Sequence, residues 1–168
     1  QTEIPLVGDV GAILQKILKR DLTTHCAPWL AKLQERRKEE LAREYPVRAG
    51  SVSPGRLMHL LGQRMSDKAA VCVDVGQNQI WACKHLWMKG GRFLTSGGLG
   101  TMGYALPAGV GVKVAQPERQ TVVICGDGSF QMSMNELAAV RAAGMDLKIV
   151  LIQNGVLGLV NQIQNTSP

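Results

Sequence analysis

The stretch from residue 121 to residue 155 constrains the fold most, because two apolar runs in it flank a helical pattern. β-Branched residues at 121–125 stop abruptly at a Gly-Asp-Gly turn that contains Asp127. A capping-box pattern from Ser133 to Glu136 predicts a helix of about three turns, which Gly144 ends. A second apolar run, 147–152, predicts a buried strand. The stretch therefore predicts one βαβ unit with parallel strands.

Polar residues follow both predicted strands, with Asp127 after the first and Asn154 after the second. Parallel strands end at the same edge of a sheet, where open α/β sheets bind ligands, so both side chains are expected at one site. A carboxylate and an amide oxygen are suitable ligands for Mg²⁺. This ion usually leaves its other coordination positions for phosphate oxygens and water. Backbone N–H groups of Gly128 and Ser129 would contact the same anion. Each motif alone is an ordinary turn or strand terminator, but the pairing favours a metal site.

Composition narrows the class of protein. A chain of 168 residues suffices for one domain with a core and a modest extra segment. No apolar run approaches the roughly 18 residues that span a bilayer, and the N-terminus has no signal-peptide pattern. We therefore expect a cytoplasmic protein without membrane contact. The net charge of +6 is scattered without a basic run, which favours an anionic small ligand over nucleic acid.

The four cysteines show no metal-type spacing, so reduced thiols are expected rather than a metal site or disulfides. Two of them fall in apolar, strand-like contexts, where a thiol behaves as a small core residue. They are Cys26, Cys72, Cys83 and Cys125.

The first fifty residues differ in character from the rest. An extended piece at 4–10 leads to a short helix capped by Asp9, and a charged, solvent-exposed helix is predicted from Pro28 to Tyr45. The chain begins at Gln1 and stops soon after an apolar segment, as a piece of a larger protein would. We predict that residues 1–50 are a linker and the tail of a missing middle domain. Residues 51–168 form the main domain, incomplete at its C-terminus.

Further strand-to-turn junctions precede the βαβ unit. A helix with Ser53 as N-cap and a buried face over 57–61 leads to a strand at 69–75, followed by a helix that includes Trp81 and Trp87. A short strand at 92–95 enters a glycine-rich loop and then a helix of small residues that packs close to the sheet. The candidate site is therefore made of four junctions, at 76–78, 96–103, 126–129 and 154–158.

The glycine-rich loop permits a second interpretation. Its pattern Gly98-x-Gly100-x-x-Gly103 matches the glycine spacing of the dinucleotide-binding motif. Asp127 follows at about the position of the acidic residue that binds the ribose in that motif. A lone pattern of this kind is weak, and NAD binding leaves Asn154 unexplained. NAD-type binding is therefore a remote alternative.

Four segments together resemble a known family. VGQNQIW, TSGGLGTMGYALPAG and GDGSFQMSMNELAAV, with a trailing QNG, closely resemble the diphosphate-binding domain of thiamine-diphosphate enzymes, specifically the acetolactate synthase and pyruvate oxidase group. The resemblance covers about residues 47–164, and PLVGDV is similar to the end of that group's middle domain. It implies a three-layer α/β/α, doubly wound, mostly parallel sheet, C-terminally truncated and preceded by a helical linker.

The resemblance also implies roles for individual residues. Mg²⁺ would be held by Asp127, by the side-chain oxygen of Asn154 and by the backbone carbonyl of Val156. Met102 would wedge the cofactor into a bent form, although a methionine here is equally explained as core filler. The implied cofactor-binding residues are Gly76, Gln77, Asn78, Gly100, Met102, Gly126, Gly128, Ser129, Leu157, Gly158 and Leu159.

Three positions depart from the family's pattern. Gln153 stands where many members have Asn, but the ligand is the following residue. Asn78 replaces a common His, so its diphosphate contact is altered. Ile163 replaces a Trp that acetolactate synthases commonly have near the substrate channel, which leaves the substrate open.

The resemblance implies an enzyme that decarboxylates a 2-keto acid such as pyruvate and transfers the two-carbon unit, as acetolactate synthase does in branched-chain amino acid biosynthesis. The activating glutamate belongs to a pyrimidine-binding domain of a neighbouring subunit in a dimer or tetramer, so no catalytic residue is assigned in this chain. Many relatives carry FAD in the middle domain. The isolated chain is expected to be inactive. A pyruvate oxidase, another 2-keto-acid decarboxylase and a folded scaffold without cofactor are the alternatives.

Overall fold

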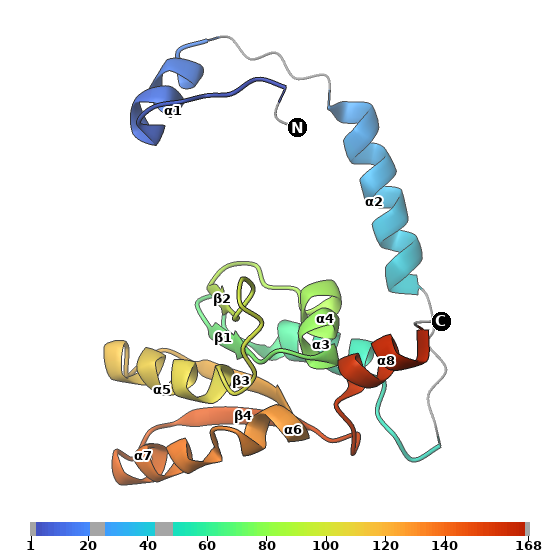
Figure 1. Ribbon diagram of the computed structural model, residues 1–168, viewed down its shortest axis with the longest axis vertical. Coiled ribbons are helices and arrows are strands. Elements are labelled where there is room, and N and C mark those ends of the chain that lie inside the picture. Colours follow the sequence, from blue (N-terminus) through green and yellow to red (C-terminus); the bar gives the residue numbers. More distant parts are fainter. Residues whose placement is uncertain (1–2, 21–25, 43–48, 167–168) are drawn as a thin grey trace. The chain divides into compact units, whose positions relative to one another are not determined.

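The computed structural model describes residues 3–20, 26–42 and 49–166. The chain divides into two compact units, residues 1–44 and residues 45–168 (Figure 1). The first unit contains α1 (Val10–Leu18) and α2 (Ala27–Ala42). The second contains the remaining elements, including the whole sheet. Within the described ranges, no helix is both long and apolar enough to cross a membrane.

Both helices of the first unit agree with the sequence patterns that predicted them. Asp9 caps α1, since its side chain accepts a hydrogen bond of 2.9 Å from the N–H of Ala12. The charged helix α2 is exposed along nearly its whole length. Its predicted last residue, Tyr45, lies outside the described residues.

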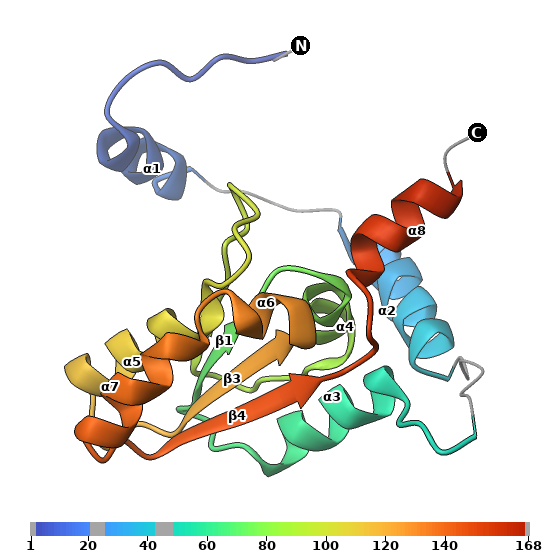
Figure 2. The ribbon, with the colours of Figure 1, turned by 60° about the horizontal axis from the view of Figure 1, so that its bottom comes forward.

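The second unit is built on a parallel sheet. Its described strands are β1 (Ala70–Val73), β2 (Arg92–Leu94), β3 (Thr121–Gly126) and β4 (Leu147–Ile152), in the spatial order β2-β1-β3-β4. Every neighbouring pair is parallel. Figure 2 shows β1, β3 and β4 with their arrowheads toward one edge.

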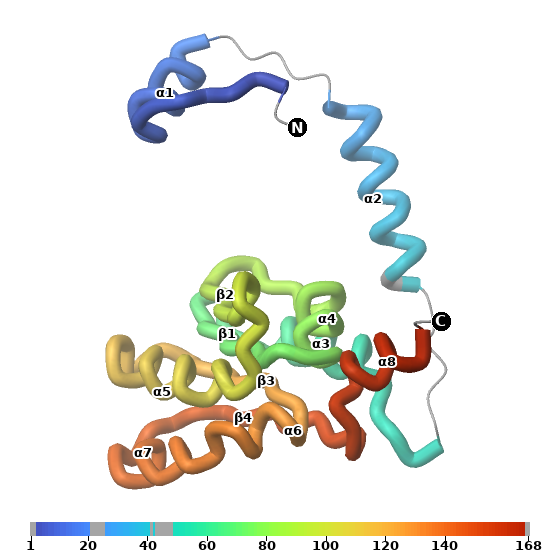
Figure 3. The backbone as a smooth tube through the Cα atoms, viewed as in Figure 1, coloured from blue at the N-terminus to red at the C-terminus, as the bar shows by residue number. Residues whose placement is uncertain are grey.

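Helices connect these strands in the alternating manner of an α/β fold (Figure 3). The helical elements are α3 (Pro54–Arg64), α4 (Gln77–His85), α5 (Ala105–Ala115), α6 (Asp127–Gln131), a 3₁₀ turn η1 (Met134–Glu136), α7 (Leu137–Ala142) and α8 (Gly158–Thr166). The strand order reverses between β1 and β3, because the chain first moves outward to β2 and then returns past β1. Ligands bind in open α/β sheets at such a reversal, outside the carboxyl ends of the strands.

Successive residues of the central strands face opposite layers, as the two-residue period of a strand requires. Val71 and Val73 pack with Met58 of α3 and Ala82 of α4 on one face. Cys72, Val123 and Cys125 pack with Ala105 and Leu106 of α5 on the other. The predicted three-layer α/β/α arrangement is confirmed.

Close contact between α5 and the sheet depends on a glycine. Gly109 is buried, and a Cβ atom there would lie 2.6 Å from Cγ2 of Val123 and 3.2 Å from Cδ1 of Leu147. This confirms the expected close packing of the small-residue helix.

The helix predicted from a capping box at Ser133 begins where expected, with Ser133 at the N-cap position of η1, but it is not one continuous α-helix and it lacks the capping bond. The chain turns helical directly after β3, at Asp127, and breaks into α6, η1 and α7. The Ser133 side chain makes no capping bond, and its hydroxyl is buried without a partner among the described residues. The local pattern failed because packing overrides it: Ser133 lies at the break and faces Gly103 of another loop. Gly144 does end the helical region, with φ of +59°.

Three smaller predictions also need correction. β4 is not buried, since it is the outermost described strand at its side and Leu151 is 47% exposed. Of the apolar face predicted over 57–61, only Met58 is fully buried. Trp87 lies beyond α4, which ends at His85. The cap at Ser53 is present, through a long bond of 3.4 Å from the N–H of Arg56.

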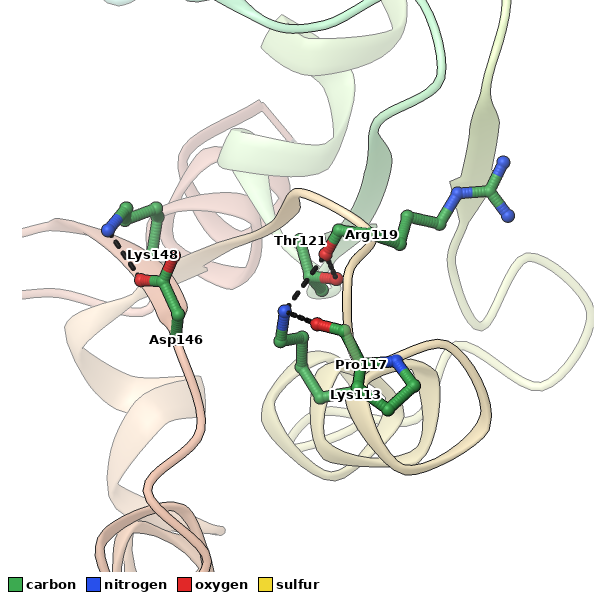
Figure 4. Close-up of polar contacts among 6 residues, drawn as sticks. All are labelled: Lys113, Pro117, Arg119, Thr121, Asp146 and Lys148. Atoms are coloured by element: carbon green, nitrogen blue, oxygen red, sulfur yellow. Dashed lines mark hydrogen bonds and ion pairs between the residues drawn. The ribbon is translucent and has the colours of Figure 1, made fainter.

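A buried lysine of α5, Lys113, lies beside the segment that leads into β3 (Figure 4). The ammonium group of Lys113 donates hydrogen bonds to the carbonyl oxygens of Pro117 and Arg119, the latter at 3.0 Å. On the surface, Lys148 pairs with Asp146 at 2.5 Å and lowers the pKa of that carboxyl group. Both interactions lie away from the loops that follow the strands.

Candidate functional site

A cavity of about 220 Å³ opens at the carboxyl edge of the sheet. Loops after all four strands line it, and every residue predicted for cofactor or metal binding is among the lining residues. The cavity is smaller than the roughly 300–1,000 Å³ of pockets that enclose a whole drug-sized ligand, so it fits part of a cofactor. The lining residues are Val75, Gly76, Gln77, Asn78, Trp81, Gly100, Met102, Gly126, Asp127, Gly128, Ser129, Ile152, Asn154, Val156, Leu157, Gly158, Leu159 and Val160.

The loops after β3 and β4 are joined by a hydrogen bond. Gly126 pairs with Ile152 at the strand ends, and beyond this pair Oδ2 of Asp127 accepts the N–H of Gly155 at 3.0 Å. Oδ1 of Asn154 accepts the N–H of Val156 at 3.1 Å. The predicted metal ligands therefore lie on adjoining segments at one edge. Carboxylate and amide oxygens each have further lone pairs, so these bonds leave them able to bind a cation.

The side chain of Ser129 stabilises the turn that follows β3. Its hydroxyl accepts the N–H of Gly126 and donates to the carbonyl oxygen of Gly126, both at 3.2 Å, and the residue is 2% exposed. The first N–H groups of a helix have no partner within it, which applies to Gly128 and Ser129 at the start of α6. A contact between Ser129 and an anion would therefore use the backbone N–H and not the hydroxyl.

At two glycines, side chains of other segments around the cavity lie close to the backbone. A Cβ atom at Gly128 would lie 2.5 Å from Cδ2 of Leu157. A Cβ atom at Gly158 would lie 2.2 Å from Oε1 of Gln77 and 2.9 Å from Nδ2 of Asn154. Only glycine fits either position without a shift, and this leaves backbone groups accessible, as an anion site requires.

The loop after β1 is held by Asn78. Its Nδ2 donates a 2.8 Å hydrogen bond to the carbonyl oxygen of Asp74, and the residue is 4% exposed. Gly76 takes φ of +139°, which a side chain would strain. Gln77 extends toward α8, where its Nε2 donates to Oε1 of Gln162 at 3.4 Å. Asn78 therefore fixes the shape of the loop as well as lining the cavity.

The loop between β2 and α5 brings Gly100 and Met102 to the cavity. A buried residue that the sequence analysis did not single out anchors the end of this loop. Oδ1 of Asp74 accepts the N–H of Gly103 at 2.9 Å, and Oδ2 accepts that of Ala105 at 3.0 Å. Asp74 could have been found from the sequence, because an acidic residue stands there directly after an apolar strand.

The chemistry of the cavity fits a magnesium–diphosphate group. Asp127 is the one titratable side chain among the lining residues, and no group of three or more His, Cys, Asp or Glu side chains gathers within the described ranges. A site with one carboxylate leaves Mg²⁺ with positions for phosphate oxygens, as this ion prefers.

The buried cysteines lie next to the site but take no part in it. Burial raises the pKa of Cys72 to about 11, and burial together with the charge of Asp74 raises that of Cys125 to about 12. Both thiols are therefore protonated core residues, as predicted.

A doubly wound parallel sheet with a cavity at its strand-order reversal defines the class of α/β cofactor-binding domains. Within this class, the family described as "Thiamine pyrophosphate enzyme, C-terminal TPP binding domain" matches residues 74–168. The chain belongs to this family. The resemblance found from the sequence motifs is thereby confirmed.

Curated relatives match nearly the whole chain. The acetolactate synthase large subunit of Lactococcus lactis subsp. lactis is 36% identical over 99% of the chain, and the acetolactate synthase of Arthrospira platensis is 40% identical over 98%. The acetolactate synthase isozyme 2 large subunit of Escherichia coli K12 is 38% identical over 98%. The chain spans about 29% of the length of each of these relatives.

Proposed function

We propose that residues 51–168 form a domain that binds thiamine diphosphate through Mg²⁺ at the carboxyl edge of the sheet. The observation that carries the proposal is the hydrogen bond of 3.0 Å between Asp127 and Gly155, which joins the two segments that supply the metal ligands. Asp127 and the side-chain oxygen of Asn154, with the carbonyl oxygen of Val156, hold the cation.

The remaining cavity residues divide between the two ends of the cofactor. Backbone N–H groups at the start of α6 and the polar residues after β1 bind the diphosphate, which an N–H-lined turn favours. Gly100 and Met102, on the loop before α5, hold the ring portion. The diphosphate-binding residues are Gly76, Gln77, Asn78, Gly126, Gly128 and Ser129. Leu157, just before α8, and Gly158 and Leu159, at its start, close the cavity.

The bound cofactor supplies the electron sink for decarboxylation of a 2-keto acid, and the protein supplies binding and orientation. Asp127 is committed to the metal, and it is the one titratable side chain among the lining residues. The resemblance to thiamine-diphosphate enzymes assigns the start of proton transfer to a glutamate of a pyrimidine-binding domain in a neighbouring subunit. We therefore propose that the isolated chain binds cofactor without turnover.

For the whole protein we propose an acetolactate synthase-like transfer of a two-carbon unit from pyruvate, in a homo-oligomer. The proposal rests on relatives with that name at 36–40% identity. Residues 1–50 would then link this domain to a middle domain, which carries FAD in many relatives. A cytoplasmic location and the absence of nucleic-acid binding stay predictions.

Calorimetric titration of Mg²⁺ and thiamine diphosphate into the chain tests the proposal. The wild-type chain should release heat, and Asp127→Ala should weaken binding at least about tenfold, since loss of a metal ligand or of its support typically costs that much. Asp67→Ala, which removes an exposed carboxylate before β1, should bind as the wild type. Absence of heat in the wild type would show a scaffold without cofactor, and heat with NAD instead would support the dinucleotide alternative.

A further inference from the structure

Asp74 is almost completely buried at the carboxyl end of β1, with 1% of its surface exposed. Its carboxylate accepts hydrogen bonds from three backbone N–H groups, those of Val75 at 2.9 Å, Gly103 at 2.9 Å and Ala105 at 3.0 Å. A buried carboxylate is costly unless hydrogen-bonded, and bonds to an ionised acceptor are the strong kind. These contacts are therefore a fixed part of the structure.

Two of the three N–H groups belong to a distant segment. Gly103 ends the loop that carries Gly100 and Met102, and Ala105 is the first residue of α5. At the tip of the same loop, the N–H groups of Gly100 and Thr101 both bond to Ser96 within the loop. Asp74 links the C-terminal end of this loop to the sheet.

The backbone of Asp74 adds two further links. Its N–H donates to the carbonyl oxygen of Ile124 in β3 at 2.8 Å, and its own carbonyl oxygen accepts from Asn78 at 2.8 Å. One residue thus connects the loop after β1 and the loop before α5 to β3, the strand that Asp127 follows. Asp74 itself does not line the cavity.

We propose that Asp74 is a positioning residue, which fixes the loop carrying Gly100 and Met102 in place before the ligand binds. The inference rests on the proposed function, because it assigns that loop to the ring portion of thiamine diphosphate. Asp74 acts through backbone N–H groups and touches no ligand. Preorganisation of this kind raises affinity by removing the cost of ordering a loop on binding.

Asp74→Asn tests the proposal with little change in side-chain volume. An amide offers one oxygen and one NH₂ group, so at least one of the three N–H groups loses its acceptor. The variant should bind magnesium–thiamine diphosphate about tenfold more weakly. Its affinity for magnesium with inorganic diphosphate, which uses the other loops alone, should stay within about twofold. Asp67→Asn, the same change at an exposed position, should alter neither.

Two calorimetric outcomes would overturn the proposal. Unchanged affinity for thiamine diphosphate shows that the loop needs no anchor, and equal losses for both ligands show a general structural role.

Hydrogen exchange in the wild-type chain gives a test that does not depend on how well the variant folds. The N–H groups of Gly103 and Ala105 should already be protected without ligand. Fast exchange that slows only when ligand is added would overturn preorganisation. A wild-type chain that binds neither ligand would refute the proposed function, while exchange would still report on the Asp74 contacts.

Discussion

Replacement of Gly109 by alanine tests how closely α5 packs on the sheet. The new Cβ atom would lie 2.6 Å from Cγ2 of Val123, a side chain that is 0% exposed and so has little room to move. Gly111, on the same helix, is exposed, and a Cβ atom there would meet nothing within 4 Å. Gly111→Ala is therefore a matched control.

The expected magnitude follows from two opposing terms. Alanine stabilises a helix interior by about 1 kcal/mol relative to glycine, and this gain applies at both positions. Overpacking costs about 1–3 kcal/mol, and so short a contact with a buried side chain places Gly109→Ala near the upper end of that range. Gly109→Ala should thus lower the free energy of unfolding by about 2 kcal/mol, while Gly111→Ala should raise it by about 1 kcal/mol.

Urea unfolding followed by circular dichroism measures both free energies. A second substitution, Val123→Ala, should remove the clash, so that Gly109→Ala costs less in that background than in the wild type. Equal stabilities of the two glycine variants, or additive effects in the double variant, would refute the close approach of α5 to β3.

Two other predictions concern buried polar and thiol groups. Lys113→Met should lower the free energy of unfolding by about 1–3 kcal/mol, because the hydrogen bonds that the buried ammonium group donates to the carbonyl oxygens of Pro117 and Arg119 are lost. Lys89→Met, at an exposed position, should change it little, and similar urea midpoints of the two variants would contradict this. Iodoacetamide at pH 8 should modify the exposed Cys26 but not Cys72 or Cys125 in the native chain, as mass spectrometry would show. Burial raises the pKa of Cys72 from 9.0 to about 11 and that of Cys125 from 9.0 to about 12. The stability that these protonated thiols contribute is therefore complete below pH 9, and it is lost as the pH rises through the two raised pKa values.

The architecture of the second unit was predictable because its signals are local. Apolar runs that stop at Gly126 and at Gln153 mark the ends of β3 and β4, and parallel connection then brings Asp127 and Asn154 to one edge. The same reasoning located the four loops, and the residues that the family resemblance assigned to them all line one cavity. Whether those residues bind the cofactor as proposed stays a prediction.

Contacts distant in sequence were beyond such reasoning. Asp74 bonds to groups 29 and 31 residues away, and no periodicity or turn pattern indicates those partners. The capping bond predicted at Ser133 is absent for the converse reason, since a good local pattern was overridden by packing against Gly103. The exposure of β4 also depends on its place in the sheet, which an apolar run alone does not indicate.

The central claim is that a divalent cation at Asp127 and Asn154 anchors a diphosphate. Mn²⁺ in place of Mg²⁺ tests it most directly, because the paramagnetic ion broadens NMR signals of nearby nuclei. With thiamine diphosphate present, the amide signals of Gly128 and Val156 should broaden, while that of Thr121, at the other end of β3, should stay sharp. Equal broadening at Thr121, or sharp signals at the two cavity residues, would contradict the account.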